Sequence, residues 1–156
     1  MSTPSSAAPR PVLQQNQGAA YTRIYAYGAA RGENAVPNED LIGPIDSSDE
    51  WIRQRTGIIT RKRANHDTSA LDLATDAARE AVERSGIDPQ EIDLVIAATI
   101  SNARQTPSLS AVLADRIGAN PAAAYDSNAA CAGFSYGVTQ ADALIRAGAA
   151  LSLIHI

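Results

Sequence analysis

Residues 92–100 read IDLVIAATI, a nearly continuous apolar run that is broken early by Asp93. Its length and its content of Val, Ile and Leu are typical of a β-strand. A strand with one solvated face would alternate apolar and polar residues, whereas this run is apolar at successive positions. The pattern therefore indicates a strand that is covered on both faces, as in a sheet with helices on its two sides.

The sequence on both sides of this strand alternates between helix and strand signals. Residues 69–86 carry an apolar stripe at helical spacing, with a serine at the start and a glycine at the end. Residues 106–118 predict a second helix, residues 122–125 a short apolar strand, and residues 131–148 a third helix. This order predicts an α/β fold with a mostly parallel sheet and right-handed crossovers.

The amino-terminal part carries weaker signals. Residues 1–20 are rich in Ser, Pro, Ala and Gln and lack apolar periodicity, so they predict a disordered tail. Tyr and Ile at close spacing over residues 22–28, followed by glycine, predict a first strand and a turn. Asn38 is expected to cap a short turn that ends at Ile42. We therefore expect one folded unit over residues 21–156.

A further helix is expected after the capping stretch Ser47-Ser48-Asp49-Glu50. It carries Trp51 and Arg55, which are four residues apart and so share a face. Five basic residues follow one another in this part of the chain without an intervening acid: Arg53, Arg55, Arg61, Lys62 and Arg63. Such a cluster is usually a solvated face, and the alternative is a site for phosphates or for an acidic protein.

Composition limits the class of protein. The chain has 156 residues, of which 45% are apolar and 19% charged, so one globular domain is expected. Its net charge of −4 argues against nucleic acid as the main partner. No apolar run is long enough to span a bilayer, and a single cysteine without a signal-peptide core favours the cytoplasm.

Several kinds of site are not predicted. No glycine fingerprint for phosphate binding is present, and no serine lies in a Gly-x-Ser-x-Gly elbow. The two histidines, His66 and His155, have no Cys or His neighbours at the spacing of metal ligands, so we expect no metal.

Cys131 is the only cysteine of the chain, and it lies between a predicted strand and a predicted helix. In the first turn of a helix, unpaired N–H groups and the macrodipole favour the thiolate, which makes the residue a candidate nucleophile. A free cysteine among alanines and glycines is also compatible with a small buried side chain, and local sequence leaves both interpretations open.

Two motifs together resemble a known family. They are Asp46-Ser47-Ser48-Asp49-Glu50-Trp51-Ile52-Arg53-Gln54-Arg55-Thr56-Gly57-Ile58 and Asp126-Ser127-Asn128-Ala129-Ala130-Cys131-Ala132-Gly133-Phe134-Ser135-Tyr136. With the α/β elements between them, they resemble the amino-terminal half of a β-ketoacyl-acyl carrier protein synthase III, over about residues 21–148. The resemblance implies a thiolase-like fold in which two similar halves form five α/β/α/β/α layers and chains pair as homodimers.

The resemblance also implies a reaction and its site residues. Cys131 matches the cysteine that takes an acyl group from acyl-CoA, and malonyl-acyl carrier protein then loses carbon dioxide and attacks the thioester. Trp51 and Arg55 match positions that hold the adenine end of CoA, which is a substrate, and no permanently bound cofactor is implied. A histidine and an asparagine that assist decarboxylation belong to the family's second half, outside this sequence.

The resemblance leaves alternatives. Thr106 stands where some relatives carry phenylalanine, so a larger acyl pocket is expected. There are three competing functions. The protein could be a starter synthase of polyketide metabolism, a transferase of the acyl group to an alcohol or amine, or a catalytically incomplete fragment that only binds CoA or pairs with itself.

Overall fold

The computed structural model describes residues 17–43 and 45–156, so most of the predicted tail over residues 1–20 lies outside the described residues. Its centre is a parallel sheet with the strand order β4 (Ala123–Asp126), β3 (Leu94–Ala97) and β5 (Leu153–His155). All residues of the central strand β3 are buried. This confirms the strand predicted within residues 92–100, although the observed strand is shorter.

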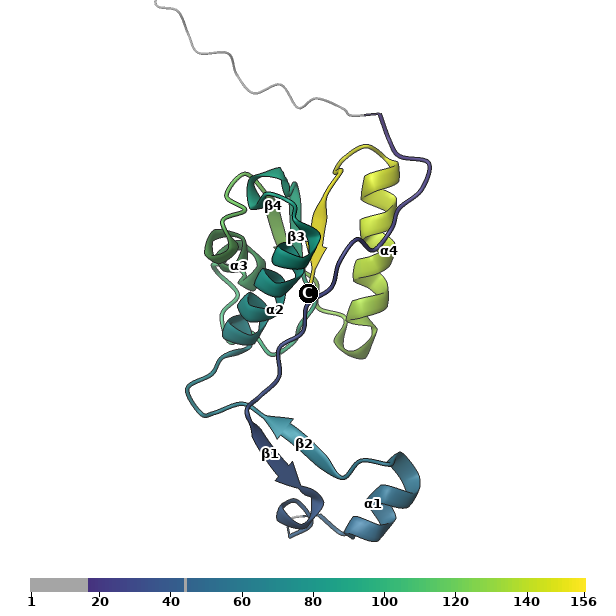
Figure 1. The fold of residues 1–156 in the computed structure, drawn as a ribbon, viewed down its shortest axis with the longest axis vertical. Coiled ribbons are helices and arrows are strands. Elements are labelled where there is room, and N and C mark those ends of the chain that lie inside the picture. The colour runs from purple at the N-terminus through teal and green to yellow at the C-terminus, as the bar shows by residue number, and fades with distance from the viewer. Residues whose placement is uncertain (1–16, 44) are drawn as a thin grey trace, which may run out of the picture.

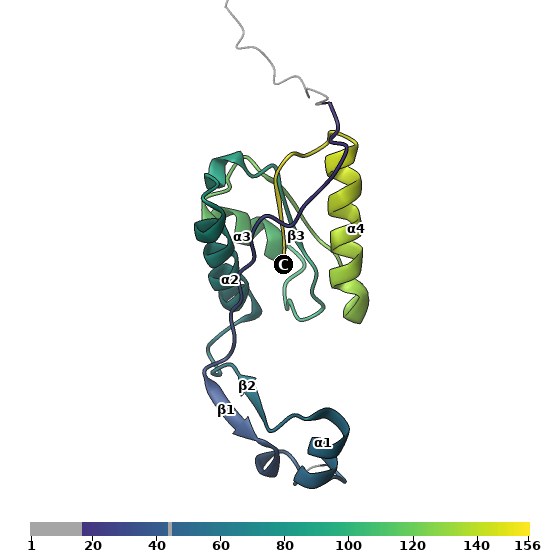
Figure 2. The ribbon, with the colours of Figure 1, turned by 45° about the vertical axis from the view of Figure 1, so that its right-hand side comes forward.

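Alternate residues of β3 contribute to two apolar clusters. Val95 and Ala97 belong to a cluster with residues of α2 (Ala70–Ser85) and α3 (Leu109–Ile117). Leu94 and Ile96 belong to a second cluster, against which Leu144 of α4 (Gly133–Arg146) packs. Helices α2 and α3 cover one face of the sheet and α4 covers the other (Figures 1 and 2). The predicted α/β class with helices on both sides is confirmed.

The ends of the helices follow from capping residues. Serine side chains accept a backbone N–H at the starts of α1 (Asp49–Thr56), α2 and α3, and a left-handed glycine ends each of these helices. Because Ser108 is the cap, α3 begins at Leu109 and not at Thr106 as predicted. Short 3-10 turns at Pro89–Glu91 and Ala130–Ala132 precede β3 and α4.

A separate hairpin lobe consists of β1 (Asn34–Pro37), α1, β2 (Thr60–Arg63) and their connections. The strands β1 and β2 pair antiparallel, with a 3-10 turn over Asn38–Asp40 after β1. Figures 1 and 2 both show this lobe extending from one end of the sheet region. The predicted helix with Trp51 and Arg55 is confirmed as α1.

The first strand predicted over residues 22–28 is wrong, because the structure has no strand there. The segment is held by side chains instead: Thr22 donates to Asp142 of α4 over 2.6 Å, and Arg84 of α2 donates to the carbonyl of Tyr27 over 2.9 Å. Tyr and Ile at close spacing favour an extended backbone, but a strand also needs a neighbouring edge to pair with. Within the described residues, no strand pairs with this segment.

Helical spacing predicts that Phe134, Val138, Ala141, Leu144 and Ile145 share the inward side of the last helix, and this prediction is partly wrong. Phe134 is 68% exposed and Val138 is 38% exposed, whereas Gly133 and Gly137 are buried. The small residues face the sheet because the backbone passes close to it: a Cβ at Gly137 would collide with the imidazole of His155. In the part of the chain that the structure describes, no helix combines the length and apolar character needed to cross a membrane.

Candidate active site

Cys131 lies in the 3-10 turn Ala130–Ala132, between the carboxyl end of β4 and the start of α4. Its side chain is exposed, so the interpretation as a buried small residue is wrong. The carboxyl ends of β3 and β4 lie at the same sheet edge because the strands are parallel, and this edge is where α/β folds commonly bind ligands. The thiol is therefore accessible to a substrate at a favourable place in the fold.

The backbone at Cys131 differs from the other helix starts. Ala130 has φ +45°, a left-handed conformation that a residue with a Cβ adopts at a cost. No side chain caps α4, whereas Ser48, Ser69 and Ser108 cap the other three helices of the described residues. The N–H of Gly133, the first residue of α4, donates to the carbonyl of Ala130, and the N–H of Ala132 donates to that of Ala129, so the 3-10 turn continues directly into α4. The positive end of the α4 dipole therefore lies at the Cys131 turn.

Asp126 ends β4 and links the turn to the neighbouring helix. Its carboxylate accepts the backbone N–H of Leu109 over 2.9 Å and of Ser110 over 2.8 Å, which caps α3. Burial alone would raise the pKa of Asp126, but these N–H donors outweigh it and the pKa lies below its usual value. An ionised carboxylate therefore fixes the strand end from which the Cys131 turn departs.

Trp51 and Arg55 lie together on α1, as their spacing predicts. The Arg55 guanidinium carbon is 5.7 Å from the centroid of the Trp51 ring, within cation–π range, and the Trp51 side chain is 55% exposed. Figures 1 and 2 place α1 in the lobe at the end of the molecule toward which the start of α4 points. The exposed indole and guanidinium offer a stacking surface on the lobe, and the start of α4 lies at the end of the sheet region from which that lobe extends (Figures 1 and 2).

The basic cluster does not act as one surface. Arg53 donates to Asp49 over 2.6 Å, Arg61 to the side chain of Asn38 over 2.6 Å, and Lys62 to the carbonyl of Glu33 over 3.2 Å. Within residues 17–43 and 45–156, the side chains of Arg55 and Arg63 make no hydrogen bond or ion pair. All the guanidinium donors of these two arginines are therefore available to an anionic ligand.

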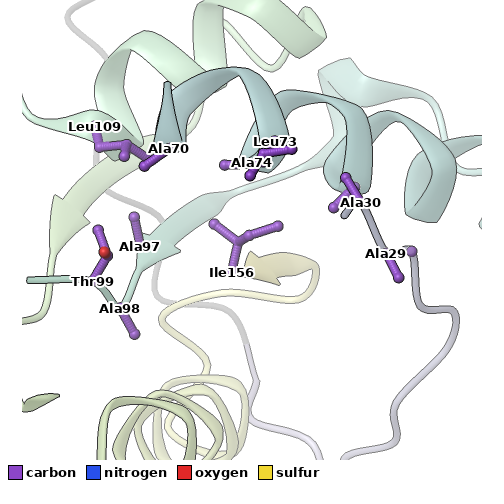
Figure 3. Close-up of a pocket in the computed structure, with 12 residues that line it drawn as sticks. Ala29, Ala30, Ala70, Leu73, Ala74, Ala97, Ala98, Thr99, Leu109 and Ile156 are labelled. Atoms are coloured by element: carbon purple, nitrogen blue, oxygen red, sulfur yellow. The ribbon is translucent and has the colours of Figure 1, made fainter. Parts of the chain in front are cut away.

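A cavity of about 380 Å³ lies elsewhere, beside β3 and α2 (Figure 3). Alanine and leucine side chains of α2, Ala97 to Thr99, Leu109 and Ile156 surround it, together with residues 28–30. Cys131, Trp51 and Arg55 do not line it, and neither does any titratable side chain. The cavity therefore has no group that could take part in acid–base or nucleophilic chemistry.

The histidines do not complete the site. His155 lies on β5, its ring centroid is 5.4 Å from that of Phe134, and burial lowers the pKa of its imidazole. His66 is exposed beside Asp67. No group of three or more His, Cys, Asp or Glu side chains that could hold a metal occurs in residues 17–43 and 45–156.

Sequence reasoning missed the role of Asn38. Its side chain is fully buried and bonds to residues 11, 20 and 23 positions away, so the predicted capping role is wrong. No local pattern could reveal such partners. The capping role of Asp126 was also missed, although an acid at the carboxyl end of a parallel strand is a usable signal.

Comparison with a known family agrees with this arrangement. Residues 53–155 match the family described as Thiolase, N-terminal domain. The β-ketoacyl-[acyl-carrier-protein] synthase III of Kocuria rhizophila is 52% identical over 144 residues, which cover 92% of this chain and 41% of that protein. The protein of the same name from Streptomyces glaucescens is 42% identical, and the match covers 88% of this chain and 41% of that protein.

Solved structures give the same result. The priming β-ketosynthase of a polyketide biosynthetic pathway superposes with a TM-score of 0.78 at 35% identity, covering 92% of this chain and 42% of that one. The synthase III from Thermus thermophilus superposes with a TM-score of 0.77 at 37% identity, and the match covers 85% of this chain and 41% of that one. The chain thus spans about 40% of the length of the relatives that it matches.

Proposed function

The chain belongs to the thiolase family through its amino-terminal domain, and from this premise we propose that it carries the acyl-accepting cysteine of a β-ketoacyl-acyl carrier protein synthase III. The observation that carries the proposal is the position of Cys131, exposed at the carboxyl edge of the sheet and directly before α4. The proposed substrates are acyl-CoA and malonyl-acyl carrier protein.

The first step is transfer of the acyl group to Cys131. The Cys131 sulfur attacks the carbonyl carbon of acyl-CoA, a new carbon–sulfur bond forms, and CoA leaves as its thiol. The carbonyl oxygen becomes negative in the intermediate, and the positive end of the α4 dipole favours that charge. The exposed thiol leaves room for the acyl carrier to approach.

The second step is condensation. Malonyl-acyl carrier protein loses carbon dioxide, and the resulting carbanion attacks the Cys131 thioester. The cysteine sulfur leaves, and the product is a β-ketoacyl-acyl carrier protein. The histidine and asparagine that the resemblance assigns to this step would come from a second half, so we propose that residues 17–156 alone perform the acylation step only.

Trp51 and Arg55 are the proposed contacts for the adenine of CoA. An aromatic face and a guanidinium plane both stack on a base, and the two side chains are already in contact range of each other. Arg55 and Arg63 are the proposed contacts for CoA phosphates or for the acidic carrier protein. Arg61 has fewer donors free for this role because one of its guanidinium nitrogens donates to Asn38.

Acylation can be tested directly because the chain has one cysteine. Incubation with acetyl-CoA should add one acetyl group per chain, measured by intact-protein mass spectrometry and mapped to the Cys131 peptide. The Cys131→Ser variant should remain unmodified. Absence of the acetyl group from the wild-type protein, or its presence on the variant, would contradict the proposal.

The CoA contact has its own test. Arg55→Ala should raise the Kd for CoA about tenfold, because a charge-assisted stacking partner worth about 1.4 kcal/mol is lost. Arg146→Ala is the matched control, since it removes an exposed arginine at the other end of α4 (Figure 1). Equal Kd values for the two variants would contradict a role for Arg55.

A second candidate is a starter synthase of polyketide metabolism, which the match to a priming β-ketosynthase favours. In a full-length protein that includes these residues, the two functions differ in the carrier protein and primer that are used. Thr106 is exposed in the loop before α3, and its effect on primer length stays a prediction. Comparing primer profiles of the full-length protein with and without Thr106→Phe tests it, and identical profiles refute it.

The homodimer that the resemblance implies and the cytoplasmic location that the cysteine content favours both stay predictions. Sedimentation of the full-length protein tests the first and fractionation of its host cell tests the second.

A further inference from the structure

Asn38 is a fully buried polar residue at the end of β1. The other two buried polar residues in the part of the chain that the structure describes are Thr75 and Ser110. Their hydroxyls bond to Leu71 and Ser108, close by in sequence, and Thr75 also accepts from Arg116 over 3.5 Å. The Asn38 amide joins separate segments of the hairpin lobe through three hydrogen bonds. A buried amide costs free energy unless its donors and acceptor are satisfied, and here they are.

The amide bonds to both ends of α1 and to β2. Its Nδ2 donates to Oδ1 of Asp49, the first residue of α1, over 2.8 Å, and to the carbonyl of Ile58, just after that helix, over 2.7 Å. Its Oδ1 accepts a hydrogen bond of 2.6 Å from Arg61 of β2. One side chain therefore fixes the start and the end of α1 relative to the hairpin.

Little else fixes this helix. α1 has eight residues, too few to be stable by themselves, and Ile52 is its one buried side chain. Asp49 is also bonded to Arg53, but that contact lies within α1 and cannot orient the helix. The placement of α1 against β1 and β2 thus depends mainly on the Asn38 amide and the Ile52 side chain.

We propose that Asn38 is a positioning residue for the CoA site, acting through α1 on the Trp51 and Arg55 pair. This inference rests on the proposed function for the role of CoA, but the positioning of α1 does not. Loss of the amide lets α1 tilt on the hairpin, and the stacking surface is then presented in many orientations. Binding of the adenine end weakens as a result, while chemistry at Cys131 is unchanged.

The ligand-free test uses Trp51, the only tryptophan of the chain, as a probe of α1. Asn38→Ala should add a fast component to the time-resolved fluorescence anisotropy of Trp51. Asn34→Ala is the matched control, because Asn34 lies at the other end of β1 and its amide bonds to Asn65, away from α1. Circular dichroism should show that the sheet region remains folded. Identical anisotropy decays in the wild-type and Asn38→Ala proteins would overturn the inference.

The ligand test compares CoA with pantetheine, which lacks the nucleotide. Asn38→Ala should raise the Kd for CoA about tenfold and leave that for pantetheine unchanged. A merely destabilised protein would lose affinity for both ligands. Where Asn38→Ala does not fold, Asn38→Ser, which keeps a smaller hydrogen-bonding group, takes its place with the same expected pattern. A uniform loss for both ligands would overturn the inference.

A double change sharpens the assignment. Asn38→Asp keeps the acceptor for Arg61 but places a second carboxylate beside Asp49, so α1 should loosen further. Adding Asp49→Asn supplies an amide donor from the other side and should restore part of the CoA affinity and of the slow anisotropy. Absence of any restoration would argue against the Asn38–Asp49 bond as the positioning contact.

The two proposals fail in distinguishable ways. If Trp51→Phe leaves the Kd for CoA unchanged, the proposed CoA contact is wrong and the role of Asn38 in CoA binding falls with it, whereas the anisotropy result still decides the positioning of α1. If Trp51→Phe weakens CoA binding but Asn38→Ala changes neither affinity nor anisotropy, the CoA contact stands and the inference about Asn38 is wrong.

Discussion

The sheet region and the hairpin lobe of this chain are held together by different forces. In the sheet region, Val95 and Leu113 are completely buried in an apolar cluster that joins the sheet to α2 and α3. In the lobe, α1 buries one apolar side chain and is otherwise held by hydrogen bonds around Asn38. The turn with Cys131 thus departs from a region fixed by apolar burial, whereas Trp51 and Arg55 lie on a helix fixed mainly by polar contacts.

The largest expected effect is on the sheet region. Leu113→Ala should lower the free energy of unfolding by about 2–5 kcal/mol, because it leaves a cavity in the fully buried cluster. Urea unfolding followed by circular dichroism measures the change. Leu151→Ala is the control, since that side chain is 60% exposed and should cost less than about 0.5 kcal/mol. Similar losses at both positions would mean that the apolar cluster is not the main source of stability.

A smaller effect is expected where a polar contact supports the sheet region. Asp126→Ala should cost about 1–2 kcal/mol, because two N–H groups at the start of α3 lose their acceptor. The pKa of Asp126 is lowered in the folded protein, so its contribution is complete above the unfolded pKa of about 3.9 and is lost as the pH falls through the lower folded value.

The pH dependence gives the second measurement on Asp126. Urea unfolding between about pH 2 and pH 7 should give a difference in the free energy of unfolding between the wild-type and Asp126→Ala proteins that is constant near neutrality and vanishes in acid. A difference that grows in acid would contradict the proposed role of the Asp126 carboxylate as the acceptor for the α3 N–H groups.

A substitution in the Cys131 turn should raise the free energy of unfolding instead of lowering it. Ala130→Gly should raise the free energy of unfolding by about 0.5–1 kcal/mol, because glycine adopts the φ of +45° without the strain of a Cβ. The same change should slow acylation of Cys131, since the turn becomes less rigid. Urea unfolding and the acetylation rate measure the two effects. Lower stability in this variant would show that the left-handed residue is not strained.

The smallest expected effect is that of salt on the lobe. The carboxylate of Asp49 is bonded to Arg53 at the surface, and that hydrogen bond is the main reason why the pKa of Asp49 is lowered. Because this pair lies within α1, raising NaCl to about 1 M should screen it and fray the helix slightly, which speeds the anisotropy decay of Trp51 without lowering the free energy of unfolding of the sheet region. Equal responses of the two regions would remove the distinction between them.

What the sequence predicts here depends on how local the signals are. The helix over residues 69–86 was predictable because its stripe, its serine cap and its terminal glycine are all within the segment, and the structure contains the capping box of Ser69 and Asp72. The buried strand within residues 92–100 was predictable because the four positions from Leu94 to Ala97 are all apolar.

The predictions that were wrong concern features that depend on contacts with distant parts of the chain. Residues 22–28 have strand-like composition, yet they bond to side chains of α2 and α4 instead of to a strand. The inward face of α4 could not be assigned from its apolar residues, because His155 of β5 occupies the space beside Gly137. Of the site, the pairing of Trp51 with Arg55 followed from spacing, whereas the contacts of Asn38 and Arg61 arise only on folding.

The single tryptophan and the single cysteine lie on the two regions compared above, one on α1 and the other before α4. A thiol-reactive dye on Cys131 would therefore accept resonance energy from the indole with no engineered label site. The efficiency of energy transfer would then report the distance between the indole on α1 and the dye on the sulfur, with and without ligand.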